Sequence, residues 1–315
     1  MSDLIEYVKL EHDRLKDLSK LFLACGKGGN IEDLNRKYAT SNFENEFVGY
    51  LAYDPLANKA VAFYGVLPVI AVIHGERVHV AQSADTVTHP DYRKRGLFIK
   101  LALLTFDLCE RLEIKVLFGI PNENSLHGFI KHLNWEIKDY YQVYEKKVLT
   151  LPMNFVLHKY GVFLKLYYRY TNFLQKIFFE KGEFFTRSDL KSDGFYILNN
   201  EFYQKYKMGS GVYDVSLSEN NLLLSVHKYI KLGVVYGSCN NLVSLKRRLV
   251  LFAILSGSHK IVFQQLSSSA VHPTIKYLMS DIAPRKGLPL IQRNLSGNVI
   301  YNEKLIVKFL DFDTF

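Results

Sequence analysis

Residues 78–112 place an extended run directly before a basic turn and a helix. The run is rich in β-prone residues through Val87, His89 and Pro90 end it, and Gly96 precedes the helical part. The helix is predicted by leucines at steps of four, three, four and four, namely Leu97, Leu101, Leu104, Leu108 and Leu112. Apolar residues at this spacing form one buried stripe of an α-helix.

The turn between this strand and this helix is a candidate anion site. Arg93, Lys94 and Arg95 lie there, immediately before Gly96. A glycine-containing turn that leads into a helix N-terminus offers unpaired backbone N–H groups and the positive end of the helix dipole, and both suit a phosphate. The alternative is an ordinary strand–turn–helix corner with solvated basic side chains.

The same residues resemble a known loop. Residues 88–97, Thr-His-Pro-Asp-Tyr-Arg-Lys-Arg-Gly-Leu, are similar to the coenzyme A pyrophosphate loop of the GNAT family of N-acyltransferases, usually Val-x-Pro-x-x-Arg/Gln-x-x-Gly-x-Gly/Ala. Arg93 and Gly96 match this pattern, whereas Phe98 stands where the second small residue is expected. The resemblance implies that coenzyme A (CoA) is bound by Thr86, Val87, Thr88, Arg93, Lys94, Arg95, Gly96, Leu97 and Phe98. The first three residues would hold its pantetheine arm along the strand.

A second block supports the resemblance. Residues 115–120 predict a short buried strand, residues 121–125 supply a turn with helix-capping side chains, and a helix follows. In GNAT proteins this strand is the fifth and splays from the fourth, and the resemblance adds Asn124 to the residues expected at the cofactor. Ile130 occupies the position where many members have the tyrosine that protonates the departing thiolate.

Acyl transfer needs a group that takes a proton from the amine and a donor for the oxyanion, and an acid assists the thiolate. The family places the oxyanion donor on a backbone N–H of the fourth strand. The carboxylates expected nearest the splayed strands are Asp85 and Glu123, and His127 is an alternative base. Tyrosines of the last strand could replace the acid missing at Ile130: Tyr140, Tyr141 and Tyr144. We therefore predict Asp85, Glu123 and Tyr144 as catalytic residues.

The domain organisation follows from the order of predicted elements. We expect a GNAT domain at residues 1–150, an aromatic and basic helical linker at 151–184, and a second, degenerate GNAT-like domain at 185–315. The second domain lacks an Arg-x-x-Gly turn at residues 237–241, so phosphate binding is expected to be lost there. The expected fold class is thus α/β with a mixed sheet, in two tandem GNAT-like copies. An unrelated α+β domain is the alternative for the second half.

Composition narrows the classes of protein and of ligand that remain. A length of 315 residues suggests two domains, and 48% hydrophobic with 23% charged residues is ordinary for a globular protein. Three scattered cysteines match no zinc or disulfide spacing, and with no signal peptide expected they favour a cytoplasmic chain. His127 and His132 are five residues apart, which does not suit shared metal ligation. We therefore expect no metal, and the dispersed basic residues argue against nucleic acid despite the net charge of +9.

Residues 155–181 interleave aromatic and basic side chains at helical spacing. Such a helix can lie in a membrane interface, which leaves weak contact with a membrane surface as one interpretation. A connector helix packed between two domains is the interpretation that we favour, because packed amphipathic helices are far more common.

The resemblance implies an N-acyltransferase that uses acetyl-CoA or another acyl-CoA as co-substrate. The block Gly-Ile-Pro-Asn-Glu-Asn-Ser is similar to GNAT proteins found beside bacterial surface-polysaccharide genes. It implies a small amine as acceptor, such as a nucleotide-linked or lipid-linked amino sugar. Two alternatives stay open: a non-catalytic CoA-binding or membrane-peripheral module, and an aminoacyl transferase of cell-wall precursors.

Overall fold

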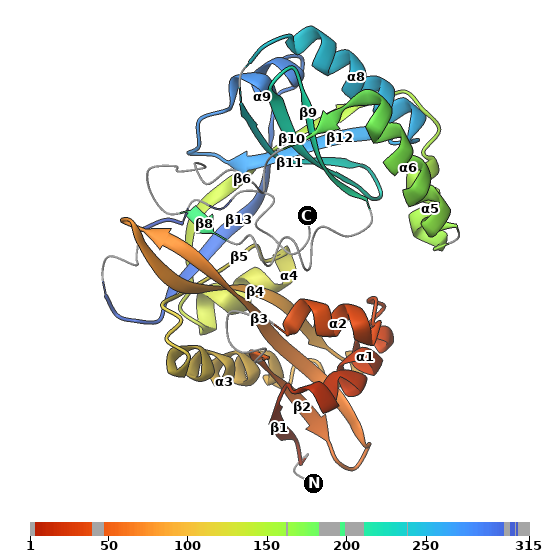
Figure 1. Ribbon diagram of the computed structural model, residues 1–315. Helices are drawn as coiled ribbons and strands as arrows, with labels where there is room; N and C mark the ends of the chain where they lie inside the picture. Colours follow the sequence, from red (N-terminus) through yellow and green to blue (C-terminus); the bar gives the residue numbers. More distant parts are fainter. Residues whose placement is uncertain are drawn as a thin grey trace. The chain divides into compact units, whose positions relative to one another are not determined.

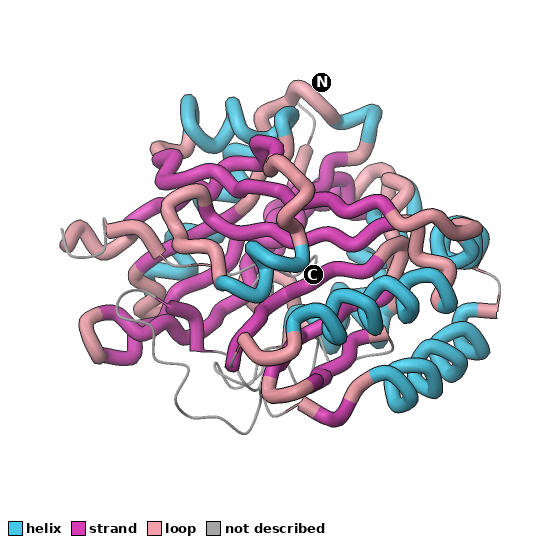
Figure 2. The backbone as a smooth tube through the Cα atoms, turned by 90° about the horizontal axis from the view of Figure 1, so that it is seen from above, coloured by secondary structure: helices cyan, strands magenta, loops and turns pink. Residues whose placement is uncertain are grey.

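The structure is a computed structural model that describes residues 4–39, 47–161, 163–182, 196–198, 211–237, 239–298, 303–305 and 307. The chain forms two compact units (Figure 1). Unit 1 comprises Met1–Lys138, Gly194–Phe202 and Leu288–Ile306. Unit 2 comprises Asp139–Asp193, Tyr203–Gly287 and Val307–Phe315. Both units combine strands and helices, so the predicted mixed α/β class is confirmed (Figure 2).

Unit 1 is built on a mixed sheet with the strand order β1-β2-β3-β4-β5-β13. These strands are β1 (Glu6–Lys9), β2 (Gly49–Asp54), β3 (Lys59–Ile73), β4 (Glu76–Thr88), β5 (Val116–Gly119) and β13 (Arg285–Asn294), and β8 (Tyr196–Leu198) pairs with β3. Neighbouring strands are antiparallel except β4 and β5, which run parallel because a helix connects them.

Helices cover both faces of this sheet (Figure 1). They are α1 (Leu15–Ala24), α2 (Ile31–Tyr38), α3 (Leu97–Arg111) and α4 (Glu123–His132), with short 3-10 turns at His12–Arg14 and Pro90–Tyr92. Alternation along β3 explains the two layers, because Phe63 packs with α1 and α2 while Tyr64 packs with α3 and α4. Of the leucine stripe predicted for α3, Leu97, Leu101 and Leu108 are buried, whereas Leu104 and Leu112 are half-buried.

In unit 2 the strands follow the order β7-β9-β10-β11-β12-β6 and are again of mixed direction. Its strands are β7 (Glu180–Lys181), β9 (Val212–Leu217), β10 (Asn220–Val226), β11 (Ile230–Gly237), β12 (Lys260–Leu266) and β6 (Glu136–Lys147). Its helices are α5 (Met153–Tyr160), α6 (Leu164–Phe178), α8 (Leu242–Leu255) and α9 (Pro273–Leu278). Only one neighbouring pair of these described strands is parallel, β11 with β12, again joined by a helix.

The two halves of the chain repeat one order of elements. The first half runs β2-β3-β4-α3-β5-α4-β6, and the second runs β9-β10-β11-α8-β12-α9-β13. The last strand of each half pairs in the other half's sheet, because β6 pairs antiparallel with β12 and β13 pairs antiparallel with β5. Residues 139–147 therefore belong to unit 2 and residues 288–294 to unit 1, which differs from the ranges 1–150 and 185–315 expected from sequence.

The expected linker also differs from its prediction. Instead of one helix there are two, α5 and α6, and both belong to unit 2. Gly161 (φ 67°) ends α5 and Phe163 (φ 56°) precedes α6, and these left-handed conformations separate the helices. Residues 305–310, whose sequence predicts one more strand, lie largely outside the described residues. Among the described residues, none of the helices has the length and apolar character of a transmembrane segment.

Candidate functional site

The site begins where β4 and β5 separate. Their parallel pairing runs from Val80 with Val116 to Gln82 with Phe118, after which β5 ends while β4 continues to Thr88. The paired stretch of these two strands is therefore short, and β4 runs on beyond it. Strand edges that separate leave backbone N–H and C=O groups available to a ligand.

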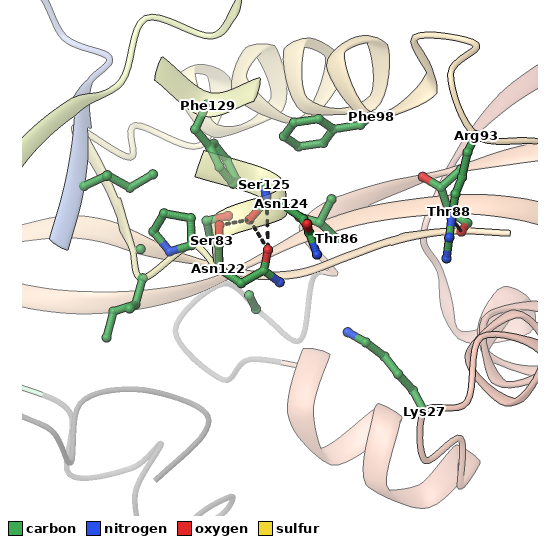
Figure 3. A pocket seen from close by; sticks show the side chains of 15 residues that line it. Lys27, Ser83, Thr86, Thr88, Arg93, Phe98, Asn122, Asn124, Ser125 and Phe129 are labelled. Carbon is green, nitrogen blue, oxygen red and sulfur yellow. Dashed lines mark hydrogen bonds between the residues drawn. The ribbon is translucent and has the colours of Figure 1, made fainter. Parts of the chain in front are cut away.

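A cavity of about 600 Å³ lies at this separation (Figure 3). All of its lining residues belong to unit 1. They are Lys27, Ser83, Ala84, Thr86, Thr88, Arg93, Phe98, Gly119, Ile120, Pro121, Asn122, Asn124, Ser125, Phe129 and Ile291. Volumes in this range are typical of small-molecule sites.

A β-bulge in β4 decides which of its side chains reach the cavity. The register with β3 moves from Tyr64↔Thr86 to Val66↔Ser83, so that Ala84 and Asp85 together oppose a single residue. Thr86 and Thr88 line the cavity, in agreement with the sequence prediction. Val87 is buried on the other face of the sheet, in the core with α1 and α2, so its side chain does not reach the cavity.

The turn after β4 presents the N-terminus of α3. Lys94 (φ 64°) and Gly96 (φ 73°) adopt left-handed conformations, and Gly96 is the N-cap residue of α3. The space around Gly96 is open, since a Cβ there would have no neighbour within 4 Å. Arg93 lines the cavity beside this turn, and its Nε donates to the Thr88 carbonyl at 3.5 Å. Backbone N–H groups, a helix dipole and a cation therefore converge on one side of the cavity.

The other basic residues of the turn lie outside the cavity lining. Arg95 stacks over the Tyr92 ring at 4.8 Å and donates to the Asp91 carbonyl, and Lys94 is exposed. Leu97 is buried in the core beneath α3. Of the turn residues predicted to bind cofactor, only Arg93 and Phe98 line the cavity with their side chains.

Phe98, the departure from the family pattern, is accommodated by a glycine on α4. Its ring packs edge-on against Phe129 at 5.1 Å, and both rings line the cavity. A Cβ at Gly128 would lie 2.7 Å from the Phe98 ring. The absence of a side chain at Gly128 therefore makes room for the large residue at Phe98.

Residues 122–125 form the opposite wall and cap α4 as the sequence predicted. The Asn122 side chain accepts a hydrogen bond from the Ser125 backbone N–H at 3.0 Å (Figure 3). Asn124 lines the cavity, as expected for a cofactor-binding residue.

Ser83 is a cavity residue that the sequence analysis missed. The fully buried Tyr64 hydroxyl donates to the Ser83 Oγ at 2.9 Å, which leaves the Ser83 hydroxyl hydrogen free for a ligand. Burial raises the pKa of Tyr64, so this tyrosine stays protonated as the donor. A serine at the end of an apolar strand segment was the available signal in the sequence.

Asp85 points away from the cavity toward α2. Its carboxylate accepts from Lys37 Nζ at 2.7 Å, Lys27 Nζ at 3.0 Å and the Tyr38 hydroxyl at 2.5 Å. Burial alone would raise the pKa of Asp85, but the two lysines and these hydrogen bonds hold it well below its usual value of 3.8. A carboxylate stabilised in this way is a poor proton acceptor.

The other predicted catalytic residues do not line the cavity either. Glu123 is exposed in the first turn of α4, between the lining residues Asn122 and Asn124. Tyr144 is buried in the core of unit 2, and its hydroxyl donates to Gln142 at 3.4 Å. Asp85 and Tyr144 are thus each hydrogen-bonded within their own unit, and none of the three predicted residues lines the cavity.

The alternative catalytic residues lie elsewhere as well. His127 is exposed on α4, with its ring 5.9 Å from that of His132. The Tyr141 hydroxyl donates to the Val307 carbonyl, and the Tyr140 ring contacts Lys286. Among the described residues, no three His, Cys, Asp or Glu side chains gather as a metal site.

Residues 29–137, about a third of the chain, match the model of the acetyltransferase (GNAT) domain. The chain carries a GNAT domain. This domain contains β4, the basic turn, α3 and the splayed β5, so the predicted resemblance is confirmed on the residues that carried it. Members of the GNAT family are N-acyltransferases that use acyl-CoA as co-substrate. No curated protein matches the chain in sequence.

Solved structures share the fold over most of the chain. A GCN5-related N-acetyltransferase from Kribbella flavida has 11% identity and a TM-score of 0.55, covering 93% of this chain and 71% of that one. Another from Anabaena variabilis ATCC 29413 has 13% identity and a TM-score of 0.54, covering 94% and 73%. A conserved protein of unknown function from Enterococcus faecalis V583 has 9% identity and a TM-score of 0.58, covering 92% and 73%. At these identities the likeness concerns the fold.

Proposed function

We propose that this protein transfers an acyl group, acetyl in the first instance, from acyl-CoA in the unit 1 cavity to a primary amine. The observation that carries the proposal is the convergence of the α3 N-terminus, Arg93 and the splayed edge of β4 on one cavity of about 600 Å³. An anionic group and an extended arm can both be accommodated by this combination.

The pyrophosphate of CoA would lie at the first backbone N–H groups of α3, next to Arg93. The open space around Gly96 supports this placement, because a phosphate has to approach the backbone closely there. Lys27 lines the same cavity, with its Nζ already paired with the Asp85 carboxylate at 3.0 Å. The pantetheine arm would run along Thr86–Thr88, where backbone groups face the separation from β5.

The Ser83 hydroxyl is the donor that we propose for the reacting thioester. When the amine nitrogen bonds to the carbonyl carbon, negative charge develops on the oxygen, and it moves to sulfur as the C–S bond breaks. Tyr64 fixes the Ser83 oxygen as an acceptor, so that the serine hydrogen is directed elsewhere. The resemblance implies a backbone N–H of β4 as a donor to this oxygen, and the Ser83 hydroxyl would add a second one.

Glu123 remains the carboxylate proposed to accept the amine proton. Glu123 is exposed and lies between two cavity residues. The lysines that keep the Asp85 carboxyl ionised do not contact Glu123 in the structure. Asp85 is better explained as a structural anchor for α2.

We propose that unit 2 is a GNAT-like copy without a CoA site of its own. Its shared order of elements and its lack of an Arg-x-x-Gly turn support this proposal. For the acceptor we propose an amino sugar linked to a nucleotide or a lipid, on the strength of the resemblance of residues 119–125 to polysaccharide-associated GNAT proteins.

The test is release of free CoA from acetyl-CoA across a panel of amines that includes nucleotide-linked amino sugars. We expect turnover with at least one amine, and loss of most of it in Ser83→Ala with CoA affinity preserved. Ser269→Ala, a serine substitution in unit 2, is the matched control and should be neutral. CoA binding without turnover of any amine would favour the non-catalytic module instead.

A further inference from the structure

The net charge of the chain resides in unit 2. This unit carries 21 Lys and Arg against 11 Asp and Glu, a net +10, whereas unit 1 carries 19 against 20, a net −1; together they give the +9 of the chain. A cofactor cavity in unit 1 cannot account for this excess. Concentrated positive charge on one unit indicates an anionic partner for that unit.

Helix α6 has two apolar faces. One is buried in the core of unit 2 through Tyr167, Thr171 and Leu174. The other is exposed, at steps of four, three and four, and consists of Leu166 (64% exposed), Tyr170 (40%), Phe173 (61%) and Ile177 (56%). A helix that has already buried one stripe has no folding reason to carry a second.

A basic stripe runs beside the exposed apolar one. Lys165, Arg169 and Lys176 are exposed on α6, each directly adjacent in sequence to a member of the apolar stripe. Between Glu145 and Glu180 the sequence contains six Lys or Arg and no acidic residue. Apolar and aromatic side chains flanked by cations only are typical of helices that lie in the interface of an anionic membrane.

The exposed apolar surface extends beyond α6 within unit 2. The loop before α5 exposes Leu149 completely and Leu151 by 76%, and the Thr150 hydroxyl ties this loop to α8 by donating to the Ile254 carbonyl at 3.0 Å. The Tyr170 hydroxyl donates to the neighbouring Leu255 carbonyl, also at 3.0 Å. These bonds join the loop, α6 and the C-terminal end of α8 into one surface (Figure 1).

We propose that this surface, which we call the α6 surface, docks on the interface of an anionic lipid bilayer. It comprises the exposed side chains of residues 149–153, of α6, and of Ile254 and Leu255. The apolar stripe would lie at the boundary between headgroups and acyl chains, and the basic stripe would contact lipid phosphates. A second copy of the chain fits less well, because two such surfaces face to face would bring like charges together.

The experiment measures sedimentation of the full chain with vesicles, without CoA. We expect binding to vesicles of phosphatidylcholine mixed with phosphatidylglycerol, weakening as salt increases, and little binding to pure phosphatidylcholine. The triple variant Lys165→Gln, Arg169→Gln, Lys176→Gln should lower the partition coefficient about a hundredfold, because each cation near the surface contributes about fivefold. Leu166→Ser with Phe173→Ser should also lower it, and both side chains are exposed enough for folding to be unaffected.

The matched control removes three exposed cations from unit 1, as Lys16→Gln, Lys20→Gln and Lys131→Gln. It changes the net charge equally and should leave vesicle binding intact. Two results would overturn the docking surface in favour of diffuse electrostatic attraction. One is an equal loss of vesicle binding in both triple variants, and the other is unchanged vesicle binding in the double variant Leu166→Ser, Phe173→Ser. A dimer in light scattering that the serine variant dissociates would assign the surface to a second copy instead.

Discussion

The helices α3 and α8 begin in the same way, yet their surroundings differ. Each helix connects two parallel neighbouring strands, β4 with β5 and β11 with β12, and the first strand of each pair runs on beyond the paired stretch. Each helix also has a left-handed N-cap residue, Gly96 in unit 1 and Asn241 in unit 2. In unit 1 the N-terminus of α3 adjoins a cavity with Arg93. In unit 2 the loop before α8 is held by side chains of its own unit.

Asn220 explains how unit 2 uses this space. It is fully buried at the start of β10, and its amide donates to the Asn240 carbonyl at 2.5 Å, just before α8. Its side-chain oxygen accepts from the Thr274 hydroxyl of α9 at 3.3 Å. The same topology can therefore leave a helix N-terminus open to a ligand, as we propose for α3. It can also fill the space beside the helix with hydrogen bonds inside the protein, as Asn220 does beside α8.

The largest expected effect concerns the donor in unit 1. Ser83→Ala removes a hydroxyl but no apolar packing, so we expect kcat to fall about a hundredfold, as for loss of one oxyanion donor. Tyr64→Phe should lower kcat less, because the serine remains but loses its orientation. Steady-state kinetics with acetyl-CoA tests this, and an unchanged kcat in Ser83→Ala would leave only the β4 backbone as donor.

Asn220→Ala should act on stability instead of activity. The substitution removes the hydrogen bonds that the buried Asn220 amide makes with the Thr274 hydroxyl and the Asn240 carbonyl, which costs about 2–3 kcal/mol of unfolding free energy. CoA affinity should not change. Denaturant unfolding measures the loss, with exposed Asn240→Ala as the matched control expected within about 0.5 kcal/mol of wild type. Weakened CoA binding in Asn220→Ala would contradict the division of roles between the units.

Asp85→Asn should destabilise unit 1 in a pH-dependent way. The Asp85 side chain is only 13% exposed, and the substitution leaves two lysines without their carboxylate, so we expect a loss of about 2 kcal/mol near neutral pH. Because the pKa of Asp85 is lowered in the folded state, its stabilisation is present above the unfolded value of 3.8 and is lost as pH falls below it.

Wild type and Asp85→Asn should therefore converge in stability on acidification below about pH 4. Asp33→Asn is the control, since that carboxylate is exposed and pairs only with Arg36 in the salt bridge that the structure gives. A constant difference between wild type and Asp85→Asn at every pH would contradict the lowered pKa.

The two left-handed caps offer a matched pair of substitutions with a smaller expected effect. Gly96→Val places a β-branched residue at φ 73°, which strains the turn and should raise the dissociation constant of CoA about tenfold. Asn241→Val imposes comparable strain at φ 50° in unit 2 and should leave CoA affinity unchanged. Calorimetric titration compares the two variants. Equal weakening by both would mean that the effect is on folding and not on a cofactor turn.

Sequence periodicity predicted the elements around the site because each pattern is local. The leucine steps of α3 and the caps of α4 follow from neighbouring residues, whereas the separation of β4 from β5 was implied only by the resemblance. The exchange of β6 and β13 could not be predicted, because alternation along a strand does not specify which of two similar sheets it joins. Tyr144 was consequently expected near the cavity but belongs to the core of unit 2.

The bulge in β4 limited the prediction of individual side chains. Simple alternation would place Ser83, Asp85 and Val87 on one face, whereas the extra residue sends Ser83 to the cavity and Asp85 to α2. A bulge arises from the pairing of two strands, and here it lies opposite Gly65 of β3. The residue pattern of β4 alone therefore does not reveal it.

The central claim is that one unit binds CoA and the other does not. Calorimetric titration of the full chain with CoA tests it most directly through the stoichiometry. The account predicts one CoA per chain, in a single binding phase. Two CoA molecules per chain would contradict it, because the second could bind only if unit 2 also kept a functional cofactor site.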